Sequence, residues 1–138
     1  SYMKDIQHLS VPIKERIKFT GFVPYEEVPK FLSIADIAIV PSLWEEPFAL
    51  TCAEAMAMGV PLIISNSGGM SEVVDANCAI IFDKTGDIPK NIRDGILELY
   101  NDNSKREKMS KAALKRAQLF SKEVYAERIT SLLSVKSI

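Results

Sequence analysis

The sequence has 138 residues and a mass of 15.4 kDa, which is the size of one domain. Hydrophobic residues make up 47% and charged residues 25%, an ordinary balance for a globular protein that argues against a disordered or collagen-like chain. No apolar run approaches the ~20 residues of a membrane span, and one histidine and two cysteines are too few for a zinc cage or a disulfide framework.

Charge divides the chain into two parts. Residues 1–103 carry 8 basic and 15 acidic side chains, whereas residues 104–138 carry 9 basic and 3 acidic ones. The acidic part argues against a nucleic-acid partner. The basic part is either a solvated helical face or a surface for anionic lipid or a partner domain, so a peripheral membrane contact stays open. Cys52 and Cys78 lie in apolar stretches, which predicts buried thiols in a reducing, cytoplasmic compartment.

The first half of the chain alternates between strand-like and helix-like patterns. Residues 16–20 alternate polar and apolar side chains and predict a strand, and residues 25–34 predict a short helix. The apolar run 37–40 predicts a strand buried on both faces. Residues 47–58 predict a helix closed by Gly59, followed by a buried strand at 62–64.

The second half begins with a loop at 66–69, a short helix at 70–75 and a strand at 78–82, and is helical from there. Isoleucines recur at 88, 92 and 96 and form one apolar stripe. We expect Ser104 and Ser121 to cap the next two helices. The apolar positions of the last helix, expected to be buried, are Val124, Tyr125, Ile129, Leu132 and Leu133.

Strands that alternate with helices predict an α/β fold, a Rossmann-like parallel sheet flanked by helices. Working residues of such sheets lie at the carboxyl ends of strands, so the places to look are after Phe19, Val40 and Ile64.

The segment after Val40 predicts an anion site. Pro47 suits the first position of a helix, where its missing N–H group is harmless. The free backbone N–H groups of Phe48, Ala49 and Leu50 would then bind an anion such as phosphate.

Two glutamates accompany this helix start. Glu54 lies on a helix without a polar face, so its carboxylate needs a hydrogen-bond donor. The two hydroxyls of a ribose fit this need, and so does a backbone amide or a nearby base. Glu46 suits sugar hydroxyls beside a phosphate, and the alternative is a charge that complements the helix dipole.

These residues carry a resemblance. Glu46 and Glu54 have seven residues between them and follow a strand that ends in Pro41-Ser42. Gly59-Val60-Pro61, Gly68-Gly69 and Glu72 come after them in order. The pattern, over residues 16–82, closely resembles the E-x7-E region of retaining GT-B glycosyltransferases, the family that includes glycogen and sucrose-phosphate synthases.

The resemblance implies roles for particular residues. Glu46 would contact the donor sugar as the catalytic residue, and Glu54 would bind the ribose. The family usually has glycine where this chain has Ala49, whose methyl group would narrow the sugar pocket. No metal or other cofactor is implied, and no D-x-D sequence occurs. The remaining substrate-binding positions are the amides of Phe48, Ala49 and Leu50 for phosphates and sugar, Thr51 for the diphosphate, and Gly21, Phe22 and Val23 for the nucleobase.

The resemblance also implies an architecture and a reaction. Residues 1–138 would be a single, partial nucleotide-sugar-binding domain from a GT-B C-terminal domain, with the acceptor domain absent. The parent enzyme would transfer a hexosyl group in bacterial polysaccharide, lipopolysaccharide or glycolipid assembly, in the cytoplasm or at the inner face of the membrane. The isolated chain would be inactive and would associate through the unpaired edge of strand 37–40. The alternatives are a non-catalytic nucleotide-binding or regulatory subunit and, more weakly, a response-regulator-like domain.

Overall fold

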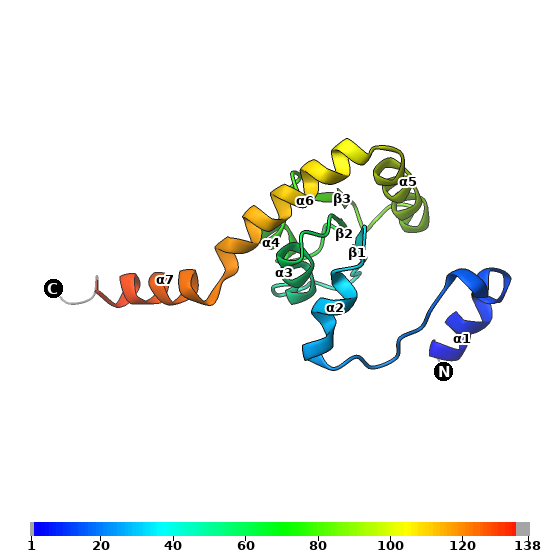
Figure 1. The fold of residues 1–138 in the computed structure, drawn as a ribbon, viewed down its shortest axis with the longest axis horizontal. Helices are drawn as coiled ribbons and strands as arrows, with labels where there is room; N and C mark the ends of the chain where they lie inside the picture. The colour runs from blue at the N-terminus through cyan, green and yellow to red at the C-terminus, as the bar shows by residue number, and fades with distance from the viewer. Residues whose placement is uncertain (1, 135–138) are drawn as a thin grey trace.

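The structure, a computed structural model, describes residues 2–134. Its centre is a parallel sheet of β1 (Ala38–Val40), β2 (Leu62–Ser65) and β3 (Ala79–Phe82), in the order β1-β2-β3 (Figure 1). Ile39 of β1 is in register with Ile63, and Ile63 with Ile80. Helices flank the sheet, so the predicted α/β class with a parallel sheet is confirmed. The helices are α1 (Tyr2–Leu9), α2 (Val28–Leu32), α3 (Leu50–Ala57), α4 (Met70–Val73), α5 (Ile88–Asn101), α6 (Asn103–Ala117) and α7 (Lys122–Ser134), with short 3-10 turns at Val11–Arg16, Tyr25–Glu27 and Gln118–Phe120.

The middle strand lies between two apolar cores. Leu62 and Ile64 pack on the side of α3, α4 and α6, whereas Ile63 packs on the side of α5. All four residues of β2 are buried, as its apolar run predicts. The prediction was wrong for β1: Ile39 is 40% exposed, because β1 lies at the edge of the described sheet with β2 as its one neighbour.

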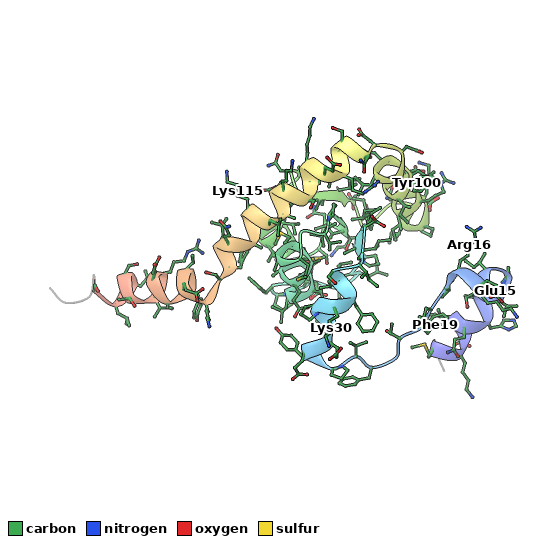
Figure 2. The ribbon with its side chains drawn as sticks, viewed as in Figure 1. Glu15, Arg16, Phe19, Lys30, Tyr100 and Lys115 are labelled. Atoms are coloured by element: carbon green, nitrogen blue, oxygen red, sulfur yellow. The ribbon has the colours of Figure 1, made fainter. Side chains whose placement is uncertain are left out.

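The strand expected at residues 16–20 is absent. The chain forms a 3-10 helix at Val11–Arg16 and then runs extended without pairing to any described strand. Every residue from 11 to 22 is exposed, and Figure 2 shows Phe19 on this segment, away from the sheet. An alternating pattern becomes a strand only where another strand supplies its hydrogen bonds. We call residues 2–24 the N-terminal arm, which lies apart from the layered body in Figure 1.

Helix α3 begins later than expected and ends as expected. It starts at Leu50, so Pro47 lies outside the helix and not at its first position. At the other end Gly59 has φ +70°, its N–H donates to the Met56 carbonyl over 2.9 Å, and the Val60 N–H donates to the Ala55 carbonyl over 2.9 Å. This is a Schellman ending, which requires a left-handed residue and favours glycine.

The C-terminal helices combine confirmed and wrong predictions. The stripe of Ile88, Ile92 and Ile96 packs against the second core. Ser121 caps α7 through the Val124 N–H over 3.2 Å, but the cap of α6 is Asp102, two residues before Ser104, the residue expected to cap it.

Helix α7 buries none of its residues, contrary to prediction. It leads away from the body in Figure 1, and among the described elements it packs mainly against the preceding turn. Exposure is 68% for Tyr125, 41% for Ile129 and 65% each for Leu132 and Leu133, and Val124 is half-buried. Within residues 2–134 no helix combines the length and apolar character needed to cross a membrane.

Candidate functional site

Residues 41–49 follow β1 at the carboxyl edge of the sheet, and we call them the acidic loop. Side chains from the neighbouring strand ends hold its backbone. The Ser65 hydroxyl at the end of β2 donates to the Ser42 carbonyl over 2.6 Å, and the Ser67 hydroxyl donates to the Trp44 carbonyl. Both serines are buried, so the irregular loop has a fixed path although it lacks secondary structure.

Gly68 and Gly69 bring a second loop against the acidic loop. Gly68 has φ +53°, and a Cβ atom there would lie 2.4 Å from the Glu46 carbonyl oxygen. A Cβ atom on Gly69 would lie 2.4 Å from the Pro47 carbonyl oxygen. The Gly69 N–H also donates to the Glu46 carbonyl over 2.6 Å. The two glycines therefore permit a backbone approach that any side chain would block.

The Glu46 side chain is oriented from the start of its own loop. The Ser42 hydroxyl donates to Glu46 Oε1 over 2.7 Å, and Ser42 is itself held by Ser65 at the end of β2. Glu46 is half-buried. A relay of two serines thus fixes a carboxylate just before α3, where its second oxygen has no hydrogen-bond partner among the described residues.

The first turn of α3 offers unpaired amides. Ala49 precedes the helix in the left-handed conformation, with φ 59° and ψ 63°, and no side chain caps the helix. The backbone N–H groups of residues 48–51 have no acceptor within residues 2–134, and the first paired amide is that of Cys52, which donates to Ala49 over 2.9 Å. Unpaired amides at a helix N-terminus favour an anion. Ala49 is 6% exposed and belongs to the larger core, so its methyl group is largely enclosed by protein.

Glu54 lies one turn further along α3 and borders a cavity of about 340 Å³. The cavity is mainly apolar, and its opposite wall comes from Tyr25 and α2. Within the described residues the Glu54 carboxylate takes part in no ion pair or hydrogen bond, so neither the backbone amide nor the base considered as partners is present. The complete lining is Tyr25, Glu26, Val28, Pro29, Leu32, Glu54, Ala57 and Met58.

The other expected binding residues, Thr51 and the segment from Gly21 to Val23, do not line this cavity. Thr51 is exposed in the first turn of α3, close to the unpaired amides. Gly21, Phe22 and Val23 are separated by Pro24 from Tyr25, the first residue that lines the cavity, and none of the three lines it. Phe22 is 92% exposed, so the structure does not bring its ring to Glu54.

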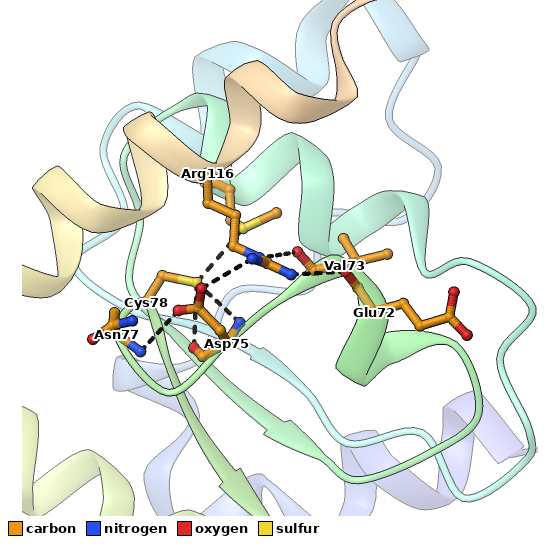
Figure 3. Close-up of polar contacts among 7 residues, drawn as sticks. Glu72, Val73, Asp75, Asn77, Cys78 and Arg116 are labelled. Atoms are coloured by element: carbon orange, nitrogen blue, oxygen red, sulfur yellow. Dashed lines mark hydrogen bonds and ion pairs between the residues drawn. The ribbon is translucent and has the colours of Figure 1, made fainter. Parts of the chain in front are cut away.

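The far side of the acidic loop faces α6 and α7. The Phe48 and Phe120 rings meet edge to face, with centroids 5.6 Å apart and an interplanar angle of 74°. Arg116 of α6 secures α4, which follows the two glycines: its guanidinium donates to the Val73 carbonyl over 2.6 Å and to the Glu72 carbonyl over 2.8 Å (Figure 3). Arg116 also pairs with Asp75 over 3.0 Å. These contacts of Arg116 attach α4, the helix that follows Gly69, to α6.

Electrostatics distinguish the groups of the site. Lys84, which follows β3, hydrogen-bonds and pairs with Glu45 and thereby lowers the pKa of that carboxyl group. Burial raises the pKa of the Cys52 thiol to about 12, and the nearby Glu46 charge adds to the shift. Cys52 is fully buried behind the first turn of α3, so its thiol stays neutral.

Sequence reasoning missed the residues that hold the loop. Ser65 is the last residue of β2, and Ser42, Ser67 and Lys84 lie within two residues after strand ends, which is the signal that could have identified them. Phe19 does not lie at a strand end, and the end of β3 at Phe82, which leads to Lys84, belongs with the ends after Val40 and Ile64 as a place to look.

Comparison with known proteins decides the family. The sequence profile described as "Glycosyl transferases group 1" matches residues 4–116. The chain belongs to this family. Among curated relatives it is 32% identical to the D-inositol 3-phosphate glycosyltransferase of Corynebacterium diphtheriae, over 89% of this chain and 28% of that protein. The chain spans about a third of the length of the curated relatives that it matches.

Solved structures agree with the group 1 fold. Sucrose-phosphate synthase from Thermosynechococcus elongatus is similar with a TM-score of 0.82 and 27% identity, over 95% of this chain and 33% of that one. HepE of Anabaena, solved in complex with UDP, is similar with a TM-score of 0.88 and 24% identity, over 97% of this chain and 37% of that one, and supports the fold alone. The GT-B assignment made from the sequence is thus confirmed at the level of family and fold.

Proposed function

We propose that this chain is the donor-binding part of a retaining glycosyltransferase that moves a hexosyl group from a nucleoside-diphosphate sugar. The observation that carries the proposal is the unpaired first turn of α3, which lies between Glu46 in the acidic loop and Glu54 one turn further on. An anion site flanked by two carboxylates suits a ligand with a diphosphate between two sugars.

Each part of the donor has a matching group. The amides of Phe48, Ala49 and Leu50, with the Thr51 hydroxyl, bind the diphosphate. Glu54, unpaired in its apolar cavity, accepts hydrogen bonds from the two ribose hydroxyls. The loop of Gly21, Phe22 and Val23 lies by the nucleobase, next to the cavity wall formed by Tyr25.

In the proposed reaction the bond between the anomeric carbon and the diphosphate oxygen breaks. The acceptor hydroxyl oxygen bonds to that carbon on the same face, and its proton passes to the departing phosphate. The Glu46 charge stabilises the positive charge that develops at the anomeric carbon. Amides and side chains offset the diphosphate charge, without a metal.

The cellular setting is part of the same proposal. We place the reaction in the cytoplasm or at the inner face of the membrane, in polysaccharide, lipopolysaccharide or glycolipid assembly. The acceptor binds to a domain outside these 138 residues. The family match supports the transferase assignment. The curated relatives are about three times the length of the aligned region, which supports an acceptor domain outside these residues.

Calorimetric titration of the 138-residue chain with UDP, GDP and ADP tests donor binding. We expect one diphosphate to bind and Glu54→Gln to weaken it by about 10- to 150-fold, since a charge-assisted hydrogen bond contributes about 1.5–3 kcal/mol. The matched control is Glu127→Gln, which changes an exposed carboxyl group on α7 that does not line this cavity and should leave affinity within about twofold. Binding by none of the three would overturn the proposal, and unchanged affinity in Glu54→Gln would remove the ribose assignment.

A further inference from the structure

Lys84 is an unusually enclosed lysine beside the acidic loop. It lies two residues after β3, and its ammonium group pairs with Glu45 and lies 3.4 Å from the Ser67 hydroxyl. Only 25% of its side chain is exposed, compared with 40–93% for the other ion-paired lysines of the described chain. This ion pair joins residues 39 apart in sequence, so it links two strand ends and not two turns of one helix.

The pair acts at the residue that precedes Glu46. Ser67, which touches Lys84, donates its own hydrogen bond to the Trp44 carbonyl. Trp44 and Glu45 are therefore both held from outside the loop, and the next residue, Glu46, is held by Ser42 and by the Gly69 amide. Without Lys84, Glu45 would keep no ion-pair partner among the described residues.

Charge gives a second reason for the lysine. Glu45 and Glu46 are adjacent in the sequence, and both side chains carry a carboxyl group. The ammonium group of Lys84 offsets the charge of Glu45 and lowers the pKa of that carboxyl group, so the loop keeps one carboxylate paired and the next one available. Glu46 uses Oε1 to accept from Ser42, and its other carboxylate oxygen has no partner among the described residues.

We propose that Lys84 is a positioning residue that pairs with Glu45 to fix the acidic loop and hold Glu46 toward the donor sugar. The orientation toward a sugar rests on the proposed function, whereas the fixing of the loop does not. Lys84 acts through Glu45 and touches no substrate.

Amide hydrogen exchange measured by NMR tests the fixing of the loop. The reporter is the Gly69 N–H, which donates to Glu46, and the control amide is that of Asn66, which donates to the Phe82 carbonyl over 2.7 Å at the same sheet edge. Lys84→Met should accelerate Gly69 exchange by about three- to tenfold and leave Asn66 unchanged, because a partly enclosed ion pair is lost while the sheet stays intact. Lys84→Arg and the charge exchange Lys84→Glu with Glu45→Lys should both restore the slow rate.

The control variant is Lys90→Met, which removes the exposed pair with Asp94 on α5 and should leave Gly69 unaffected. Unchanged Gly69 exchange in Lys84→Met, or equal acceleration of Gly69 and Asn66, would overturn the loop-fixing role.

A second titration separates this proposal from the proposed function. Lys84→Met should weaken binding of the nucleotide-sugar at least threefold more than binding of the same nucleoside diphosphate alone, because only the sugar meets Glu46. Equal weakening of both refutes the link to the sugar. If the unaltered chain binds neither ligand, the proposed function and the sugar link fall together, and the exchange result alone decides whether Lys84 fixes the loop.

Discussion

The acidic loop and the extended part of the N-terminal arm both lie outside the sheet, and they differ in the contacts that surround them. The acidic loop at 41–49 receives hydrogen bonds from Ser65, Ser67 and Gly69 and an ion pair from Lys84. The N-terminal arm is exposed from residue 11 to 22 and pairs with no described strand. The comparison teaches that irregular backbone becomes a defined site when neighbouring strand ends supply its partners.

We expect the largest effect, a loss of stability, at Gly68, and compare it with Gly21, which is also in the left-handed conformation. Gly68→Ala should lower the free energy of unfolding by at least about 3 kcal/mol, because left-handed strain adds to a clash with the Glu46 carbonyl. Gly21→Ala in the arm has similar strain, with φ +64°, but no atom within 4 Å of the new Cβ. Its left-handed strain of about 1–2 kcal/mol is offset by about 0.5–1 kcal/mol of backbone entropy gained on replacing glycine, so the net loss should be about 1 kcal/mol. Urea denaturation measures both, and equal losses would contradict the difference between the two segments.

Glu46 in the acidic loop should affect catalysis more than binding. In an active transferase that contains this chain, Glu46→Ala should lower the turnover rate at saturating donor by about 100-fold or more. Nucleoside diphosphate affinity should change less than about twofold, because Glu46 is proposed to face the sugar. Glu46→Gln keeps a hydrogen-bond acceptor for Ser42 while removing the charge. A normal rate in Glu46→Gln would show that the residue only shapes the loop.

Features that depend on local sequence alone were predictable, whereas features that depend on a distant partner were not. Residues 62–64 form a continuous apolar run, and the structure buries β2 on both faces. Gly59 predicts the end of α3 because the left-handed ending depends on local backbone chemistry. The strand prediction for the N-terminal arm was wrong, because an alternating pattern at residues 16–20 does not reveal whether a partner strand exists.

In the candidate site, residues within one segment were predictable, and contacts between distant segments were not. Glu46, Glu54 and the unpaired amides follow from motif spacing within one segment. The contacts of Lys84 with Glu45 and of Ser67 with Trp44 join residues 39 and 23 apart, and such distances are set by sheet order rather than by local pattern. The apolar residues of α7 predict a buried helix, but α7 buries none of its residues. An apolar residue in a helix does not specify which element packs on it.

Alkaline pH tests the enclosed side of the acidic loop. Folding raises the pKa of Cys52 from 9.0 to about 12, so its contribution to stability is fully present below pH 9 and is lost as the pH rises toward 12. In that window one titrating thiol lowers stability by about 1.4 kcal/mol per pH unit. Cys52→Ala should lack this component, so the difference between the two unfolding curves measured from pH 8 to 11 isolates it. Parallel curves would show that the thiol is more accessible than its burial indicates.

A smaller effect concerns the exposed edge of β1. Unpaired strand edges recruit other strands, and Ile39 on this edge is 40% exposed. We expect the chain to form dimers or larger species, measured by light scattering during gel filtration. Ile39→Lys should raise the dissociation constant about tenfold, equivalent to about 1.4 kcal/mol. A clean monomer at all concentrations would contradict this, and protection of residues 17–20 on association would show that the arm becomes ordered by pairing.

The smallest expected effect is at Ala49, where the acidic loop uses alanine in the conformation that the arm gives to glycine. Ala49→Gly should release about 1–2 kcal/mol of left-handed strain. Against this, glycine costs about 0.5–1 kcal/mol of backbone entropy, and the lost methyl group, enclosed in the core, costs about 0.8 kcal/mol. These contributions nearly cancel, so stability measured in urea should stay within about 1 kcal/mol of the original chain. A clear gain would show that the methyl group packs poorly, and the alanine would then have to be explained by the ligand beside it rather than by the core behind it.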